Sequence, residues 1–385
     1  MASTDDLRSF FLQTYGCKTN QYESQGIREA LERAGLRAVA GPAHADLCVV
    51  NTCAVTARAD ASCRNAVRRL QRANPSARLV LAGCSVDLDQ EWTRTLAPDA
   101  LRLTNDDKHA IVRRLGLPVS DERPPVMRFA FSLRRFEGHS RAFVKIQDGC
   151  DVNCAYCTIP AARGHPRSRP LDAILQESRR LIAAGHRELV LTGINIGAYL
   201  DERGHDLPHV VRSVGALRGL ERLRLGSVEP QLVTDALLRA MQEVPAVCPH
   251  LHLPLQSGDD RILRRMRRPY TSGDFLALVD RIRAHVDAPA LTTDVIVGFP
   301  GEDEAAFAGT LHTFTAAAFS RAHVFLYSAR PGTHAADLPS PASNRVITNR
   351  HRHLRTAAEE MAAQYAAGFV GRTVRVLPER CTGST

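Results

Sequence analysis

The stretch GCDVNCAYC, residues 149–157, places three cysteines in a C-x-x-x-C-x-x-C array. The apolar segment AFVKIQ, residues 142–147, comes directly before it, so the array is expected on a loop at the carboxyl end of a strand. Thiolates are soft ligands that suit iron–sulfur clusters or zinc. Structural zinc takes four ligands, and the nearest imidazole, His165, lies eight residues beyond Cys157. A four-iron cluster on three cysteines instead leaves one iron open to bind a small molecule.

The composition is that of a globular protein with room for two domains: 385 residues, 44% hydrophobic and 24% charged. No apolar run approaches the ~18 residues needed to cross a bilayer. The start, MASTDDLRSFFLQTYGC, carries acids where a secretory signal would carry bases, so we expect a cytoplasmic protein with no membrane partner. In that reducing compartment the ten cysteines are poor disulfide candidates, and metal binding or catalysis is the expected role of the clustered ones.

The net charge of +9 favours a polyanionic partner such as RNA. Arginine supplies nearly all of the positive charge, because lysine occurs only at Lys18, Lys108 and Lys145. A solvated, arginine-rich surface explains the same composition. Basicity alone therefore indicates RNA binding only weakly.

Strand and helix patterns alternate through residues 1–117. The expected strands are RSFFLQTYG (8–16), ADLCVVNTC (45–53) and ARLVLAGC (77–84), and the expected helices are QYESQGIREALERAG (21–35) and ADASCRNAVRRLQRA (59–73). This alternation predicts an α/β domain with a doubly wound parallel sheet. Prolines and mixed charge interrupt the rhythm over residues 118–140, where we expect a linker.

The alternation resumes over residues 141–370. The expected strands are AFVKIQ (142–147), ELVLTG (188–193), RLRLGSV (222–228), HLHLPL (250–255), LTTDVIVGF (291–299) and AHVFLYS (322–328). Six strand–helix units predict a partial (β/α)6 barrel whose reactive groups gather at the carboxyl ends of the strands. The segment RVITNRHRHLRTAAEEMAAQYAAGFVG (345–371) is expected to form a closing helix, after which residues 371–385 are too few for a domain.

Three further cysteines, Cys17, Cys53 and Cys84, end or follow the expected strands of the first domain. The carboxyl ends of parallel strands line one edge of a sheet, so these three cysteines are expected to meet there and share a metal site. Free cysteine is also a common buried residue. That simpler explanation suits the remaining cysteines, which are Cys48, Cys63, Cys248 and Cys381.

Several motifs together resemble those of a known family. The C-x-x-x-C-x-aromatic-C array, with Tyr156 as the aromatic residue, is similar to that of the radical S-adenosylmethionine enzymes. Around the other three cysteines, G-C-x-x-N-x-x-E-S, N-T-C-x-V-T and G-C resemble the methylthiotransferases. The same resemblance extends to KIQDGCDVNCAYCTIPAARG (145–164), ELVLTGINIGAY (188–199), LGSVEPQLVTDALL (225–238), HLHLPLQSGDDRILRRMRR (250–268) and DVIVGFPGE (294–302). The chain is therefore identified as a member of the radical S-adenosylmethionine methylthiotransferase family.

The resemblance implies two [4Fe–4S] clusters and S-adenosylmethionine. The first cluster would be held by Cys150, Cys154 and Cys157 and would bind S-adenosylmethionine at its open iron. The auxiliary cluster would be held by Cys17, Cys53 and Cys84 and would carry the sulfur that is inserted. The family's S-adenosylmethionine pocket corresponds here to Tyr156, Thr192, Gly193, Glu229, Gln256, Ser257 and Gly298.

Simpler roles exist for some of these positions and for the basic residues nearby. Glycines serve turns, and Glu229 is placed to cap a helix that starts near Gln231. Arg163 and the run RRMRR (264–268) are suited to bind phosphates or carboxylates. For RRMRR, a solvated helix face explains the sequence equally well.

The branches of this family differ in substrate. One modifies isopentenylated adenosine in tRNA, another N6-threonylcarbamoyladenosine next to the anticodon of tRNA, and a third an aspartate of a small-subunit ribosomal protein. NTCAVTARAD (51–60), GINIGAYL (193–200) and SVEPQLVTD (227–235) most resemble the threonylcarbamoyladenosine branch. A threonylcarbamoyl carboxylate would be well matched by an arginine, although the sequence does not identify which one.

The resemblance implies a reaction in two stages. A 5′-deoxyadenosyl radical removes the hydrogen from C2 of adenine, and sulfur from the auxiliary cluster attacks that carbon. A second S-adenosylmethionine then supplies the methyl group. A hydrogen on an aromatic carbon is not acidic enough for a side-chain base, which is why a cofactor-derived radical is needed.

The implied partners are tRNA, an electron donor of the flavodoxin or ferredoxin type, and a sulfur donor. Family members usually end in a small β-barrel (TRAM) that grips tRNA, and GRTVRVL (371–377) resembles its first strand. A stable sheet needs at least about three strands, so the fifteen residues from Gly371 predict a truncated or absent barrel. An alternative of another class is a non-catalytic iron–sulfur redox protein, which would use the same cysteines without an S-adenosylmethionine pocket.

Overall fold

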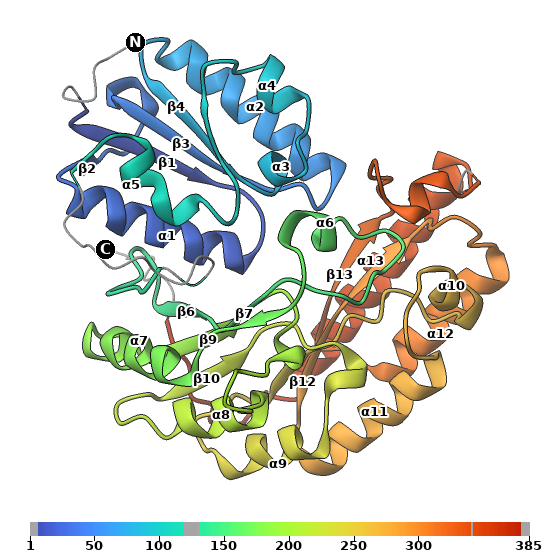
Figure 1. Ribbon diagram of the computed structural model, residues 1–385. Coiled ribbons are helices and arrows are strands. Elements are labelled where there is room, and N and C mark those ends of the chain that lie inside the picture. The colour runs from blue at the N-terminus through green and yellow to red at the C-terminus, as the bar shows by residue number, and fades with distance from the viewer. Residues whose placement is uncertain (1–6, 119–128, 130, 340–341, 379–385) are drawn as a thin grey trace.

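The computed structural model describes residues 7–118, 129, 131–339 and 342–378. Figure 1 shows two α/β parts, a smaller N-terminal one and a larger one that contains β6 to β13. The two parts touch, since α1 (Lys18–Arg33) packs on β6 (Arg141–Lys145). None of the helices within the described ranges has the length and apolar character needed to span a membrane.

The N-terminal part is a parallel sheet in the strand order β2-β1-β3-β4-β5. Its strands are β1 (Ser9–Thr14), β2 (Arg37–Ala38), β3 (Leu47–Thr52), β4 (Arg78–Gly83) and β5 (Leu101–Leu103). Alternate residues of β3 point to opposite faces of the sheet. Val49 packs in the core that includes α1, whereas Val50 packs with α2 (Ala57–Ala73). The doubly wound sheet is confirmed. Its strand order reverses between β1 and β3, and folds of this kind bind ligands at such a point.

Short helices fill the connections of this sheet. They are η2 (Pro42–His44), α3 (Cys84–Asp87), α4 (Trp92–Thr95), η3 (Lys108–Ala110) and α5 (Ile111–Arg114). Two short edge strands, β2 and β5, were not expected from the sequence. They carry too few apolar residues to stand out as strand patterns, and they form by pairing with β1 and β4.

The larger part is an open barrel of parallel strands. The strands are β6, β9 (Glu188–Thr192), β10 (Arg222–Leu225), β11 (His250–His252), β12 (Ala290–Val297) and β13 (Arg321–Leu326). They pair in the orders β10-β9-β6 and β11-β12-β13, and parallel bridges such as Ser227 to His252 join β10 to β11. All six strands expected from the sequence are present in the described ranges, so the partial (β/α)6 barrel is confirmed.

Helices cover the outside of this barrel. They are α7 (Leu171–Ala183), α8 (Leu207–Gly215), α9 (Asp235–Glu243), α11 (Ser272–His285), α12 (Glu304–Ala317) and the closing helix α13 (Asn344–Ala367). Shorter elements lie at the strand ends: the antiparallel pair β7 (Gln147–Asp148) and β8 (Arg167–Ser168), the helices α6 (Ile159–Arg163) and α10 (Asp260–Arg265), and the 3-10 turns η5 (Ile196–Ala198), η6 (Pro230–Leu232) and η7 (His334–Asp337).

The barrel strands separate apolar from polar residues by alternation. In β12, Leu291, Val295 and Val297 are fully buried in the core shared with the helices. Thr292 and Asp294 lie on the opposite face and remain partly exposed. Because successive side chains of a strand point to opposite faces, these polar residues line the inner face of the barrel. The inner face is therefore available for polar chemistry, while the outer face holds the fold together.

Two expectations about connecting segments are modified. Within the segment expected as a linker, Leu133 and Phe136 are buried in the main core, so residues 131–136 are packed structure, whereas residues 119–128 and 130 lie outside the described residues. The strand expected at GRTVRVL does not form over the described residues 371–378. Strand hydrogen bonds need a neighbouring strand, and among the described residues no strand pairs with this segment, whose carbonyl at Pro378 accepts a side-chain hydrogen bond from Ser140.

Candidate active site

The three cysteines that follow β7, Cys150, Cys154 and Cys157, form the barrel triad. Gly149 starts their loop with φ +77°, and a Cβ at this position would lie 2.0 Å from the carbonyl oxygen of His165. Only glycine fits this close approach. The backbone N–H of Cys150 donates to the carbonyl of Gly164 at 3.0 Å, and that of Cys157 to the carbonyl of Cys154 at 3.0 Å. The loop thus turns the partly exposed cysteines around one point at the carboxyl end of the barrel.

Hydrogen-bond donors point at the sulfur atoms of this triad. Arg268 Nη1 lies 3.0 Å from Cys154 Sγ, and the backbone N–H of Ile159 lies 3.4 Å from Cys157 Sγ. Burial raises the pKa of Cys157 to about 12, so the free protein favours the thiol. A bound metal displaces that proton, and the two donors then stabilise the thiolates.

Arg268 is a site residue that the sequence did not single out within RRMRR. Its side chain is 1% exposed and forms an ion pair with Glu229, with Nη1 3.4 Å from Oε1. Its Nε donates to the hydroxyl of Tyr270 at 3.1 Å. The solvated helix face is therefore wrong for this arginine, whereas the expected contact with a carboxylate is present and is made to Glu229 of the same chain.

The second set of cysteines, Cys17, Cys53 and Cys84, forms the sheet triad at the carboxyl edge of the N-terminal sheet. Thr52 of β3 and Gly83 of β4 are direct partners in the ladder, so Cys53 and Cys84 follow equivalent positions. The loop before Cys17 reaches the same place, because a Cβ on Gly16 would lie 2.7 Å from Cys53 Cβ and 2.8 Å from its Sγ. The topology therefore brings together three cysteines that are far apart in sequence.

Polar side chains support the sheet triad. Asn20 donates to the carbonyl of Thr52 at 2.9 Å, which fixes α1 against the loop of Cys53. The amide of Asn105 lies 3.8 Å from Cys84 Sγ. Burial raises the pKa of Cys53 to about 12 and also raises that of Cys84, although attraction from Arg163 and Lys108 opposes the shift at Cys84. These neighbours suit a metal-bound thiolate at Cys84 better than a free thiol.

The simpler role predicted for the other cysteines fits those that the structure describes. Cys63 is fully buried, and its sulfur accepts a hydrogen bond from the backbone N–H of Cys53 at 3.4 Å. Cys48 is buried in an apolar cluster, and Cys248 is also buried, with Arg224, Arg222 and Glu188 close enough to affect the pKa of its thiol after burial itself. Cys381 lies outside the described residues.

Neither triad has the geometry of a site for a single metal ion. Among the described residues, no three His, Cys, Asp or Glu side chains converge closely enough to ligate one metal ion. In a four-iron cluster the cysteines bind different irons, so their sulfur atoms are farther apart than the ligands of one ion. The side chain of His165 is exposed, and only its backbone contacts Gly149. These observations favour a cluster over zinc at the barrel triad.

Three of the residues expected around S-adenosylmethionine have polar groups near the barrel triad or on the inner face. Burial raises the pKa of Cys150, and the nearby charge of Glu229 adds to that shift; Glu229 makes no capping hydrogen bond to η6. Thr192 is on the inner face at the end of β9, in register with Lys145. Gln256 has a left-handed backbone with φ +63°, and its Oε1 is buried without a partner among the described residues. An orphaned buried acceptor of this kind fits a ligand that donates a hydrogen bond.

The remaining four expected residues contact the protein itself. Tyr156 packs edge-on against Phe299 at 6.4 Å, and the Ser257 hydroxyl lies 3.1 Å from that of Thr310. A Cβ on Gly193 would lie 2.8 Å from the carbonyl of Gln147, and one on Gly298 would lie 2.8 Å from Ile347. Local packing is thus sufficient to explain both glycines, and no ligand is needed to account for them.

A cavity lies away from both triads. It measures about 790 Å³ and is lined by residues at the amino ends of β4 and β5, including Arg78 and Leu101. Ligands of parallel α/β sheets bind at the carboxyl ends of the strands. The two triads, rather than this cavity, are therefore the candidate site.

Known families and proteins resemble this chain over both of its parts. Residues 144–314 match the radical SAM superfamily, and residues 9–102 match the uncharacterized protein family UPF0004. The chain is 40% identical, over 97% of its length and 88% of the relative's, to a threonylcarbamoyladenosine tRNA methylthiotransferase MtaB of Chlamydia pneumoniae. It is 38% identical, over 96% of its length and 78% of the relative's, to a tRNA-2-methylthio-N(6)-dimethylallyladenosine synthase of Thermobifida fusca.

Solved structures show the same fold at low identity. The radical S-adenosylmethionine methyltransferase TsrM from Kitasatospora setae superimposes with a TM-score of 0.60 at 15% identity, over 83% of this chain and 75% of TsrM. The cobalamin-dependent S-adenosylmethionine radical enzyme OxsB gives 0.55 at 9% identity, over 93% of this chain and 56% of OxsB.

The superfamily match implies that the chain binds S-adenosylmethionine and one [4Fe–4S] cluster, which the barrel triad fits. These relatives are enzymes, and they match nearly the whole length of this chain. The alternative of a non-catalytic redox protein is therefore wrong. The chain belongs to the radical S-adenosylmethionine methylthiotransferase family.

Proposed function

We propose that this protein is a tRNA modification enzyme that methylthiolates C2 of N6-threonylcarbamoyladenosine next to the anticodon. The product is 2-methylthio-N6-threonylcarbamoyladenosine. The barrel triad holds the cluster that binds S-adenosylmethionine, and the sheet triad holds a second [4Fe–4S] cluster. The observation that carries the proposal is the presence of two separate cysteine triads on adjoining elements of the two parts, since α3 begins at Cys84 and packs on α6, which follows Cys157.

S-adenosylmethionine bound at the reduced cluster supplies the 5′-deoxyadenosyl radical. The protein's own residues provide the surroundings. Glu229 and the orphaned Oε1 of Gln256 offer acceptors to an ammonium or hydroxyl group of the bound molecule. Arg268 holds Glu229 and Cys154 in one arrangement through its guanidinium. The adenine base of the substrate then binds at the inner face of the barrel.

Sequence identity to relatives does not choose the substrate, because relatives named for the threonylcarbamoyl and the dimethylallyl nucleoside match at 40% and 38%. The charge of the inner face favours the threonylcarbamoyl group. Burial lowers the pKa of Lys18, and repulsion from Arg141 and Arg224 adds to the shift while attraction from Asp294 opposes it, so these side chains lie close together. Arg224 also pairs with Glu188 at 2.9 Å. The carboxylate of a threonylcarbamoyl group is attracted by this set of cations, whereas a dimethylallyl group is uncharged.

Aromatic side chains continue the same face towards β13. The ring centroids of His252 and His323 are 6.5 Å apart, and those of His323 and Phe325 are 6.3 Å apart. Phe325 is 42% exposed although it is a large apolar residue. Exposed aromatic faces of this kind stack on unpaired bases of single-stranded RNA. The inner face thus combines a surface for a base with cations for its carboxylate.

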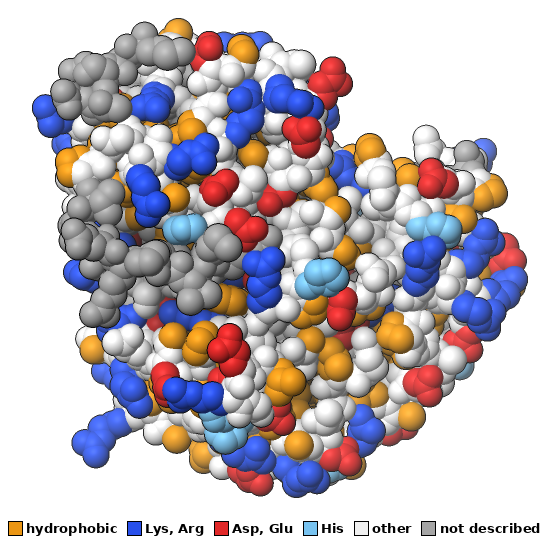
Figure 2. All heavy atoms as spheres, viewed as in Figure 1, with side chains coloured by type: hydrophobic (Ala, Val, Ile, Leu, Met, Phe, Trp, Pro, Cys, Tyr) orange, Lys and Arg blue, Asp and Glu red, His pale blue; other side chains and the backbone are white. Residues whose placement is uncertain are grey.

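Lys and Arg side chains are spread over both parts of the molecule on the face shown in Figure 2, without a single dominant patch. Such a distribution suits contacts to a folded RNA at several separate phosphates. It supports tRNA as the partner without identifying individual contacts. An electron donor of the flavodoxin or ferredoxin type and a sulfur donor complete the proposed set of partners.

Product identity tests the proposal. Expressed in a host that lacks its own methylthiotransferases, the protein is expected to produce 2-methylthio-N6-threonylcarbamoyladenosine in tRNA, detected by mass spectrometry of digested nucleosides. A variant lacking the sheet triad serves as the control. Appearance of the isopentenyl analogue alone would replace the proposed substrate with the second candidate.

Lys18 is expected to contribute to recognition of the carboxylate. The Lys18→Met variant should lower kcat/KM for tRNA carrying threonylcarbamoyladenosine by about 10- to 100-fold, because a hydrogen bond to a charged group contributes ~1.5–3 kcal/mol. Lys18→Arg keeps the charge and should retain most of the activity. Unchanged kcat/KM in Lys18→Met would show that the carboxylate is bound elsewhere.

A further inference from the structure

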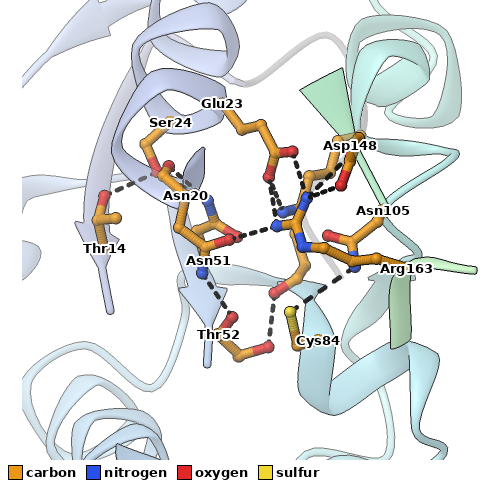
Figure 3. Close-up of polar contacts among 12 residues, drawn as sticks. Thr14, Asn20, Glu23, Ser24, Asn51, Thr52, Cys84, Asn105, Asp148 and Arg163 are labelled. Atoms are coloured by element: carbon orange, nitrogen blue, oxygen red, sulfur yellow. Dashed lines mark hydrogen bonds and ion pairs between the residues drawn. The ribbon is translucent and has the colours of Figure 1, made fainter. Parts of the chain in front are cut away.

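A buried ion network joins the two parts of the molecule next to the sheet triad (Figure 3). Its centre is the carboxylate of Glu23 in α1, which accepts hydrogen bonds from Lys108 at 2.5 Å, Lys145 at 2.7 Å and Arg163 at 2.9 Å. Asp148 accepts from Arg163 at 3.0 Å and lies 2.6 Å from Lys145. The five side chains are between 0% and 3% exposed. The expectation that Arg163 binds phosphates or carboxylates is met by two carboxylates of the protein itself, those of Glu23 and Asp148.

The network crosses from one part to the other and reaches the loops of the sheet triad. Glu23 belongs to the N-terminal part, whereas Asp148 and Arg163 belong to the barrel. Arg163 Nη2 also donates to Asn20 Oδ1 at 2.8 Å, and Asn20 Nδ2 in turn donates to the carbonyl of Thr52 at 2.9 Å. Thr52 comes immediately before Cys53. A cation of the barrel is thus connected by two hydrogen bonds to the backbone of the sheet triad.

A second short path connects the two triads through α6. This helix begins two residues after Cys157 and ends at Arg163. It packs on α3, which begins at Cys84. The amide of Asn105 links the two helices, because its Nδ2 lies 3.1 Å from the carbonyl of Ala162 and 3.8 Å from Cys84 Sγ. Movement of α6 relative to the N-terminal sheet would therefore move the two triads relative to each other.

Apolar packing would hold the two parts together at least as well as this network. A buried ion pair gains little net stability over apolar side chains of the same volume, because the charges lose their hydration. What the ions add is geometry, since each carboxylate oxygen here accepts from donors in fixed directions. We propose that the Glu23–Arg163 network positions the two triads relative to each other and so couples cleavage of S-adenosylmethionine to sulfur insertion. This inference rests on the proposed function.

The test compares Arg163→Lys and Glu23→Gln with a matched control, Tyr22→Phe. Tyr22 lies next to Glu23 on α1, and its hydroxyl also crosses between the parts, donating to Glu177 at 3.1 Å, but it makes no hydrogen bond to the elements of the sheet triad. In reconstituted protein, 5′-deoxyadenosine and methylthiolated nucleoside are measured together with bound iron. Hydrogen–deuterium exchange of α1 and α6 is measured in the iron-free protein.

In both network variants, the ratio of 5′-deoxyadenosine to methylthiolated product is expected to rise by about tenfold or more at unchanged iron content, because small misplacements of reacting groups cost large factors in rate. Exchange in α1 and α6 should be faster than in the wild type, and Tyr22→Phe should match the wild type in both readouts. A proportional loss of both products, an unchanged ratio, or loss of about half the iron would each contradict the positioning role. The wild-type product itself tests the proposed function separately.

Discussion

Replacing Cys150, Cys154 and Cys157 together by alanine is expected to abolish cleavage of S-adenosylmethionine while leaving about half of the bound iron, because we propose that each triad holds its own four-iron cluster. The barrel triad lies after β7, and the sheet triad lies at the edge of a different sheet, so loss of one set of ligands leaves the other intact. The expected fall in 5′-deoxyadenosine is complete, since no side chain replaces a cofactor that supplies the radical. Iron analysis and chromatography of 5′-deoxyadenosine measure both effects.

A matched control for this variant uses cysteines outside both triads. Cys48 and Cys248 are buried outside both triads, and their replacement by alanine should leave the iron content and the cleavage of S-adenosylmethionine near the wild-type values. Full retention of iron in the triple variant would show that the barrel triad holds no cluster. Loss of all the iron would show that the two sites are not independent.

The second large effect is expected at the sheet triad. Replacing Cys17, Cys53 and Cys84 by alanine should preserve formation of 5′-deoxyadenosine and eliminate the methylthiolated nucleoside. The barrel triad and Arg268 are untouched in this variant, so the radical still forms. The sulfur that is to be inserted no longer has a cluster to hold it. Mass spectrometry of digested tRNA and iron analysis, with about half of the iron again retained, give the readouts.

A different outcome would assign the sheet triad a different role. If the variant with alanine at all three positions still produces the methylthiolated nucleoside, these cysteines do not supply sulfur. The proximity of Gly16 to Cys53 would then be explained by packing alone. Cys63, which contacts only the backbone of Cys53, is the internal control, and Cys63→Ala should retain the product.

The long strands and the placing of both triads at strand ends could be predicted from the sequence because their signals are local, whereas the short strands β2 and β5 could not. Apolar runs that end in cysteine mark the carboxyl ends of β3 and β4, and parallel strands bring such ends to one edge. The barrel strands were recognisable in the same way, because polar or glycine residues such as Thr192 and Gly298 end their apolar runs. Each prediction needed only the residues of one segment and a general rule of sheet topology.

The buried ion network could not be predicted, because it depends on how two folded parts meet. Glu23 lies in a helix that appears amphipathic from its sequence, and such an acid is ordinarily exposed. Its partners Lys145 and Arg163 come from β6 and α6 of the barrel part, more than a hundred residues away. The sequence held two local signs of the network. One was Lys145 in the otherwise apolar strand β6, and the other was the presence of both Asn20 and Glu23 in the motif around Cys17.

The functions of individual glycines and of Arg268 were also beyond sequence reasoning. Gly193 and Gly298 are explained by close approach to Gln147 and Ile347 of the same chain, contacts that only the folded barrel reveals. Arg268 belongs to a run of four arginines, and nothing in the run distinguishes the one that turns inward to Cys154. Charge runs show where cations are available, and packing decides which of them are buried.

The origin of the hydrogen removed from the substrate tests the central claim most directly. With tRNA whose N6-threonylcarbamoyladenosine carries deuterium at C2, the 5′-deoxyadenosine released during turnover is expected to contain one deuterium, measured by mass spectrometry. The methylthiolated nucleoside should have lost it. Unlabelled 5′-deoxyadenosine formed together with methylthiolated product would contradict the account, because the radical would then not act at the carbon that receives the sulfur.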